Sequence, residues 1–139
     1  MIHSGDLDFS FSGIKTSVLY LIKKLPELTE EIKRHIALEF ENAVTEVLVA
    51  KTKKALEQYS AKMLLIGGGV IANTHIRKEF EELAEAENVP LFIPEKNLTT
   101  DNALMIAVAG LLRVTSRSPL SKAQNGITKA KGNLRLDEI

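Results

Sequence analysis

The sequence predicts an α/β fold with a few parallel strands and flanking helices, and three observations lead to this prediction. A short and mostly apolar stretch, Lys62–Ile66, leads into the glycines at 67–69. A stretch with helical spacing of apolar residues follows and ends at Asn88. A second apolar run, 89–93, comes directly after it. A strand, a helix and a strand in this order form a unit whose two strands run parallel.

The composition excludes several classes of protein. The 139 residues suit one domain, and a hydrophobic content of 45% can supply a core. The absence of cysteine excludes disulfides and thiolate metal ligands. Lysine and arginine number 18, as do aspartate and glutamate, so any affinity for RNA must be local. No stretch approaches the roughly 18 apolar residues of a membrane helix, and no signal peptide is recognisable, so we expect a cytoplasmic protein without membrane contact.

The first part of the chain predicts a short strand and then a helix. Apolar and polar residues alternate from Asp6 to Ser12, which is the period of a half-buried strand. Gly13 ends this pattern, and 14–25 continues as a helix that Pro26 stops. The segment 13–16 resembles the end of a phosphate-binding loop but lacks the upstream glycine of that motif. It therefore has two interpretations, a helix start and an anion site.

A long helix is predicted from about 30 to 59. Thr29 is a suitable N-cap, and the glutamates after it complement the helix dipole. The lysines within 51–54 are expected on its solvated side, and His35, which has no partner at ligand spacing, is expected to be structural. Apolar residues at helical spacing indicate a core or a lobe interface: Ile32, Ile36, Phe40, Ala43, Val44, Val47, Leu48, Ala55 and Leu56.

The glycines at 67–69 lie between a strand and a helix, an arrangement that suits anion binding. Residues without a Cβ let the backbone approach a ligand, and the following helix presents the positive end of its dipole. A tight turn without a ligand is the alternative interpretation. Gly67, Gly69 and Ala72 also satisfy the relaxed dinucleotide fingerprint, although that motif usually lies on the first strand of a domain. No lysine follows as a phosphate loop would require.

Asn73 and Thr74 begin the next predicted helix. Asn73 has two interpretations: as an N-cap it satisfies a backbone N–H, and as a ligand residue its amide contacts a hydroxyl or carbonyl beside the anion. His75 is expected to be exposed on the first turn. The predicted buried face of this helix comprises Ile76, Phe80, Leu83 and Ala84.

The loop at 95–100 is predicted to leave the same sheet edge as the glycines, where open α/β sheets bind ligands. The helix predicted at 103–114 is apolar on nearly every side and is therefore expected to be buried. Thr99 and Thr100 can cap this helix. Asp101 then either compensates the helix dipole or binds a divalent cation that faces the anion site.

Three separated blocks agree in order and spacing: Asp8–Thr16, Gly68–Asn73 with Arg77, and Thr100–Ala107. They resemble the signature motifs of the TsaD family, whose members were formerly called glycoproteases. The resemblance implies the two-lobed fold of actin, Hsp70 and sugar kinases. It makes residues 1–115 a portion of the C-terminal lobe and 116–139 a tail, whose basic residues either contact RNA phosphate or are solvated.

The resemblance also implies an activity, the transfer of threonylcarbamoyl from threonylcarbamoyl-AMP to adenosine 37 of tRNAs that read ANN codons. Gly68 and Gly69 would hold that ligand or an ATP-like nucleotide, Asn73 would contact the substrate, and no catalytic residue is assigned. Asp101 would bind one divalent metal ion, with iron or zinc expected and magnesium as the alternative. The implied partners are tRNA, the family's N-terminal lobe and, for a bacterial protein, TsaB-like and TsaE-like proteins.

The chain also departs from the family pattern. The family's other metal ligands form an H-x-x-x-H motif, which His3, His35 and His75 do not form. We therefore expect an incomplete metal site, no activity of this chain alone, exposed apolar faces and self-association. The alternatives are a noncatalytic nucleotide-binding or interaction module, a dinucleotide-binding domain, and the metalloprotease suggested by the former name, which no H-E-x-x-H motif supports.

Overall fold

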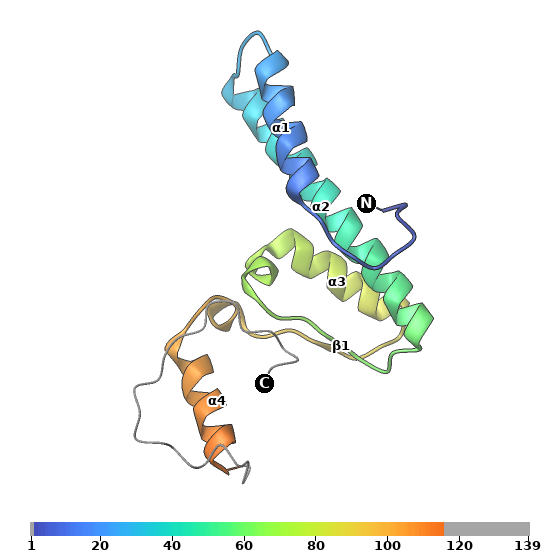
Figure 1. Cartoon of the computed structure of the whole chain (residues 1–139), viewed down its shortest axis with the longest axis vertical. Coiled ribbons are helices and arrows are strands. Elements are labelled where there is room, and N and C mark those ends of the chain that lie inside the picture. Colours follow the sequence, from blue (N-terminus) through green and yellow to red (C-terminus); the bar gives the residue numbers. More distant parts are fainter. Residues whose placement is uncertain (1, 116–139) are drawn as a thin grey trace. The chain divides into compact units, whose positions relative to one another are not determined.

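The computed structural model describes residues 2–115 of the 139 residues, so the predicted tail at 116–139 lies outside the described residues. The chain divides into two compact units after Asp101. The elements of the first unit are α1 (Ser12–Lys24), α2 (Glu30–Tyr59), β1 (Leu64–Leu65), the 3₁₀ helix η1 (Gly69–Ala72), α3 (Thr74–Ala86), β2 (Leu91–Phe92) and the 3₁₀ helix η2 (Lys96–Leu98) (Figure 1). The second unit contains α4 (Ala103–Thr115).

The strands β1 and β2 pair in parallel, which confirms the predicted strand-helix-strand unit. Leu64 lies opposite Leu91 in the register. A backbone hydrogen bond of 3.0 Å from Ile66 N to Phe92 O extends the ladder beyond β1. Both strands are shorter than the apolar runs that predicted them. Within the described residues β1 and β2 pair only with each other. The outer edge of each strand therefore has no hydrogen-bonded partner strand.

A small apolar core lies where α3 meets α2 and the sheet. Leu56 of α2 and Ile71 of η1 complete the buried cluster, and Ile71 is 2% exposed. The apolar stripe of α2 is only partly buried, since Leu56 is buried whereas Phe40 is 41% exposed. The buried residues of α3 are those that the sequence predicts: Ile76, Phe80, Leu83 and Ala84.

The predicted ends of the first two helices are confirmed. Thr29 caps α2, because its Oγ1 accepts a hydrogen bond of 3.3 Å from Ile32 N. The helix ends at Tyr59, and Ser60 follows with a left-handed φ of 49°. Leu25, which follows α1, is extended, as expected of a residue that precedes proline.

The predicted strand at Asp6–Ser12 is wrong. An alternating pattern forms a strand only beside another strand, and none of the described strands pairs with this segment. The helix α1 begins at Ser12, so Gly13 lies in its first turn, and the Thr16 hydroxyl donates to Ser12 O at 3.1 Å. These contacts favour the helix start over an anion-binding loop at 13–16.

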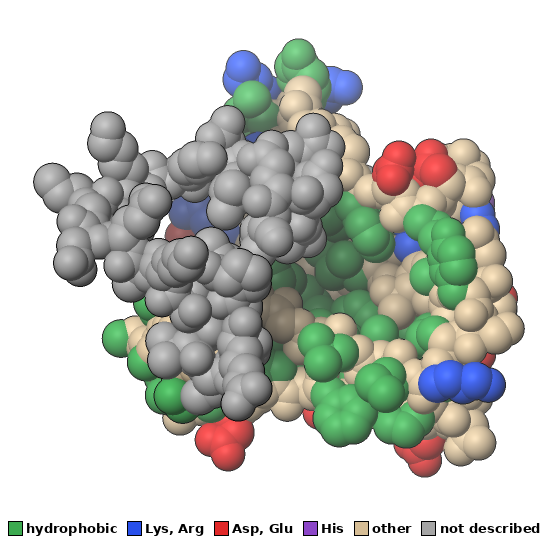
Figure 2. Space-filling model, turned by 60° about the horizontal axis from the view of Figure 1, so that its bottom comes forward, with side chains coloured by type: hydrophobic (Ala, Val, Ile, Leu, Met, Phe, Trp, Pro, Cys, Tyr) green, Lys and Arg blue, Asp and Glu red, His purple; other side chains and the backbone are tan. Residues whose placement is uncertain are grey.

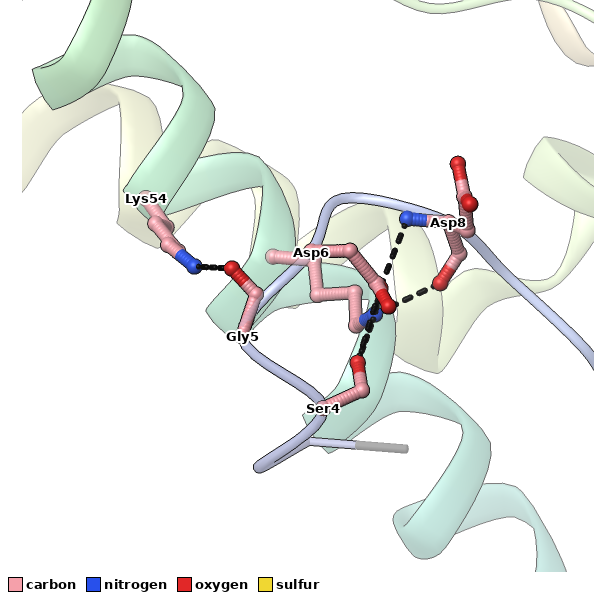
Figure 3. Close-up of polar contacts among 6 residues, drawn as sticks. Ser4, Gly5, Asp6, Asp8 and Lys54 are labelled. Carbon is pink, nitrogen blue, oxygen red and sulfur yellow. Dashed lines mark hydrogen bonds and ion pairs between the residues drawn. The ribbon is translucent and has the colours of Figure 1, made fainter.

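Lys51 contradicts the prediction that it lies on the solvated side of α2, because its side chain is 3% exposed. Its ammonium donates to Ser4 Oγ and Asp6 Oδ1, both at 2.9 Å, and to Asp8 O at 2.5 Å (Figure 3). It also lies 5.8 Å from the centroid of the Phe9 ring. A buried charge is tolerated when it has such partners. The ammonium thereby ties the N-terminal segment to α2.

The other two lysines of this stretch agree with the prediction. Lys53 and Lys54 are both exposed. Lys53 forms an ion pair of 2.8 Å with Glu87 beyond α3, and Lys54 donates to the carbonyl of Gly5 (Figure 3). The second contact adds to the attachment of the N-terminal segment on α2.

The helix α4 forms where predicted, but its expected burial is wrong for the described residues. Asn102 is its cap, since Asn102 Oδ1 accepts a hydrogen bond of 3.0 Å from Met105 N. Exposed apolar helix faces, which we also expected, are confirmed, and Figure 2 shows hydrophobic side chains gathered on one face of the molecule. The exposed side chains of α4 are Leu104, Met105, Ile106, Val108, Leu111 and Leu112. None of the described helices is long and apolar enough to cross a membrane.

Candidate functional site

The glycine corner, which we define as residues 66–73, connects β1 to α3. Gly68 has a φ of +95°, a conformation that side-chain-bearing residues rarely adopt. The turn η1 follows, so the chain reaches α3 through a 3₁₀ helix and not directly from the glycines. A Cβ at 67, 68 or 69 would meet nothing within 4 Å. Within the glycine corner, therefore, only the conformation of Gly68 requires glycine.

Asn73 joins η1 to α3, and its predicted capping role is confirmed. Its Oδ1 accepts hydrogen bonds from His75 N at 2.9 Å and from Ile76 N at 3.0 Å. Its Nδ2 donates to Glu41 Oε1 of α2 at 2.6 Å. An amide nitrogen carries two hydrogens, so a second N–H remains for a ligand. His75 is half-buried, not exposed as predicted.

The first turn of α3 is not an open anion site. The side-chain oxygen of Asn73 accepts from the N–H groups of His75 and Ile76, and the backbone carbonyl of Asn73 accepts from Arg77 N at 3.1 Å. An anion at this corner would therefore have to bind the backbone of the glycines. The Arg77 side chain donates to Pro94 O at 2.9 Å and holds α3 against the segment that follows β2.

A cavity of about 550 Å³ opens beside the glycine corner. Its polar lining comes from Glu41 and Asn73, and Gly69 forms part of its wall. A mostly apolar cavity with a few converging polar groups is the usual form of a small-molecule site. The apolar side chains that line it are Phe11, Phe40, Val44, Leu48, Val70 and Ile76.

Asp101 lies outside this cavity. The strands β1 and β2 run parallel, so the glycine corner and the segment that leads to Asp101 leave the same edge of the sheet. Asp101 is exposed and does not line the cavity. Within residues 2–115 no group of three or more histidine, aspartate or glutamate side chains could hold a metal ion. Gly69 and Asn73 thus line one cavity, whereas Asp101 belongs to no such group of potential ligands among the described residues.

The N-terminal segment that carries Phe11 to the cavity is held by electrostatics. The Lys51 ammonium, followed by the Ser4 hydroxyl, lowers the pKa of Asp6 from 3.8 to about 2. Asp6 Oδ1 also accepts from Asp8 N at 3.1 Å. The charged carboxylate is therefore the form that this local structure favours.

The comparisons with known proteins concern most of the chain. A family model described as "TsaD: tRNA N6-adenosine threonylcarbamoyltransferase" matches residues 2–108. The chain belongs to the TsaD family. Two of the TsaD motifs, Asp8–Thr16 and Gly68–Asn73, meet at the cavity through Phe11, Gly69 and Asn73. The third TsaD motif, Thr100–Ala107, includes the boundary between the two units.

Curated relatives carry the same description. The tRNA N6-adenosine threonylcarbamoyltransferase of Polynucleobacter necessarius is 45% identical over 125 residues, which cover 85% of this chain and 35% of the relative. That of Nitrosospira multiformis is 39% identical over 140 residues, which cover 100% of this chain and 40% of the relative. That of Thermosipho africanus is 42% identical over 110 residues, which cover 79% of this chain and 33% of the relative. The chain thus spans between 33% and 40% of the length of these TsaD proteins.

Two residues that shape this TsaD site were not predicted from the sequence. Glu41 contacts Asn73 across 32 positions, and Lys51 contacts Asp6 across 45 positions. A signal was present, because both share a helical face with Val44 and Leu48 of the apolar stripe. A charged residue on an apolar face indicates a partner, although it does not identify that partner.

Proposed function

We propose that the chain is part of a tRNA N6-adenosine threonylcarbamoyltransferase. The enzyme would transfer threonylcarbamoyl from threonylcarbamoyl-AMP to adenosine 37 of tRNAs that read ANN codons. Family membership supports the activity. At the level of residues, the observation that carries the proposal is the cavity where two TsaD motifs meet.

The residues of the cavity suit a nucleotide. Gly68 and Gly69 would hold threonylcarbamoyl-AMP or an ATP-like nucleotide, because backbone N–H groups without a neighbouring Cβ can approach phosphate oxygens. Asn73 would donate its second Nδ2–H to the ligand. Phe11 and Phe40 supply aromatic surface against which a base can pack.

The proposed reaction is an acyl transfer. The exocyclic amine of adenosine attacks the carbonyl carbon of the threonylcarbamoyl group, the bond from that carbon to the phosphate oxygen breaks, and AMP leaves as the amine loses a proton. No covalent intermediate on the protein is needed. The glycine backbone would stabilise the negative charge that develops on the leaving phosphate.

We also propose that Asp101 is one ligand of a divalent metal ion, with iron or zinc expected and magnesium as the alternative. One exposed carboxylate does not form a metal centre by itself, and the described residues contain no group of three or more potential ligands. We therefore assign no step of the reaction to the ion. A complete set of ligands would therefore need residues from outside the described part of the chain.

The proposed setting is the two-lobed fold of actin, Hsp70 and sugar kinases, with this chain in the C-terminal lobe. The parallel pairing of β1 with β2 supports this setting. The proposed partners are tRNA and TsaB-like and TsaE-like proteins. A second candidate is a noncatalytic nucleotide-binding or interaction module. The cavity at the glycine corner, which has no part in a group of three or more potential metal ligands among the described residues, supports this candidate for the chain acting alone.

One assay separates the two candidates. Threonylcarbamoyl-AMP, tRNA and TsaB-like and TsaE-like proteins are incubated with this chain, or with a longer TsaD protein that contains it. Mass spectrometry of the tRNA nucleosides then measures N6-threonylcarbamoyladenosine. We expect product with the longer protein and none with the chain alone. The absence of product with the longer protein would refute the transferase proposal.

A further inference from the structure

Glu41 of α2 holds the side-chain amide of Asn73. Its Oε1 accepts a partly buried hydrogen bond of 2.6 Å from Asn73 Nδ2. Both side chains line the cavity at the glycine corner. The contact therefore joins α2 to the start of α3 at the point where a ligand would bind.

The carboxylate of Glu41 selects one orientation of the Asn73 amide. In the observed orientation Asn73 Oδ1 accepts from two backbone N–H groups and Nδ2 faces the carboxylate. In the reversed orientation an oxygen would face the Glu41 carboxylate, which can only accept, and the amide N–H groups would face two donors. Every one of these favourable contacts would become a repulsive one.

We propose that Glu41 is a positioning residue for Asn73. Glu41 keeps the second Nδ2–H of Asn73 at the cavity wall. There it lies next to the carboxylate oxygen of Glu41 that does not bond to Asn73. The pair then offers a donor beside an acceptor. The amino-substituted edge of a nucleobase presents the complementary pattern. The choice of an adenine nucleotide as ligand rests on the proposed function, whereas the orientation of the amide does not.

Substitutions at Glu41 separate positioning from packing. In Glu41→Gln the side-chain carbonyl still accepts from Asn73 Nδ2, so the orientation is kept. In Glu41→Leu no acceptor remains, although the side chain has a similar size. Glu41→Met is a second apolar variant in case leucine prevents folding. Glu39→Leu is the matched control, because Glu39 is an exposed glutamate on the same helix.

The first measurement needs no ligand. In the ¹⁵N-labelled 139-residue chain, the two Nδ2 protons of Asn73 should resonate far apart, because one of them is bonded to a carboxylate. We expect this separation to persist in Glu41→Gln and Glu39→Leu and to collapse in Glu41→Leu. Unchanged Asn73 resonances in a folded apolar variant would overturn the inference.

The second measurement is the dissociation constant of AMP for the longer TsaD protein. We expect it to rise about tenfold in Glu41→Leu, the usual effect of losing a hydrogen bond to a charged group. It should also rise in Glu41→Gln, although Asn73 stays oriented, because an NH₂ donor replaces the carboxylate oxygen that would accept from the nucleobase. It should stay within about threefold of the parent in the control Glu39→Leu. Equal affinities of the parent and Glu41→Leu would overturn the inference. If the parent protein binds no AMP, the proposed function fails, and the amide resonances alone decide the role of Glu41.

Discussion

Lys51 and Asp6 form an ion pair of 2.9 Å in which the lysine side chain is 3% exposed and the aspartate side chain is 51% exposed. The lysine projects from α2, and the aspartate belongs to the segment that leads to Phe11 at the cavity. A single buried ammonium thus connects the N-terminal segment to the helix that also carries Glu41.

Replacing Lys51 should release the N-terminal segment. In Lys51→Met the partners of the ammonium lose their shared donor, so amide hydrogen exchange at Asp8 should accelerate by at least about tenfold. Exchange mass spectrometry of the N-terminal peptide measures this change. Lys53→Met is the control, since Lys53 is exposed and contacts Glu87 instead. Equal exchange in the two variants would show that Lys51 does not hold the segment.

The same ion pair predicts how stability depends on pH. The pKa of Asp6 is lowered from 3.8 to about 2, so the unfolded chain binds more protons than the folded chain between these values. The contribution of Asp6 is complete above its unfolded pKa and is lost as the pH falls through about 2. Urea unfolding between these pH values should show a decline that Asp6→Asn lacks. A decline of the same size in both proteins would contradict this assignment.

Gly68→Ala should destabilise the chain by about 1–3 kcal/mol, because a φ of +95° is strained for any residue with a Cβ. Gly67→Ala and Gly69→Ala are the controls, since their Cβ atoms would meet nothing within 4 Å and neither has a positive φ. Urea unfolding measures the differences. If the controls stay stable but lose affinity for AMP, the ligand itself approaches these glycines.

Two variants of Asn73 should separate its capping role from its ligand role. Both variants lose the hydrogen bond to Glu41, but Asn73→Ser keeps an N-cap. Asn73→Ser should therefore be more stable than Asn73→Ala by about 1 kcal/mol, the usual effect of a lost cap. Both should abolish tRNA modification by the longer protein, because both lack the amide. Full activity of a stable Asn73→Ser protein would remove Asn73 from the proposed ligand contacts.

Asp101→Ala should lower the metal content of the longer TsaD protein and abolish tRNA modification. Asp101 is exposed, so the free energy of unfolding should change by less than about 0.5 kcal/mol. Elemental analysis gives the metal content, and Glu95→Ala, another exposed acidic variant of this loop, is the control. Unchanged metal content in Asp101→Ala would show that Asp101 is not a ligand.

Features encoded locally were predictable from the sequence. The spacing of apolar residues located all four buried positions of α3, and the short polar side chains of Thr29 and Asn73 marked the starts of two helices. Pro26 and Asn88 marked where helices must stop. The parallel pairing followed from the order of the elements.

Features that depend on distant partners were not predictable. The segment Asp6–Ser12 has the pattern of a strand, but a strand needs a neighbour to pair with. Lys51 is buried because segments far apart in the chain supply its partners. An apolar helix such as α4 is buried only where another segment packs on it. Its composition indicates that such a segment is needed but does not identify it.

The sheet of β1 and β2 has a consequence for assembly. Its two strands pair only with each other among the described residues, so each offers a row of backbone donors and acceptors along its outer side. A pair of such short parallel strands is marginal in water without further strands or covering helices. Any polypeptide that completes this layer must therefore dock edge-on, aligning its own backbone with Leu64–Leu65 or Leu91–Phe92.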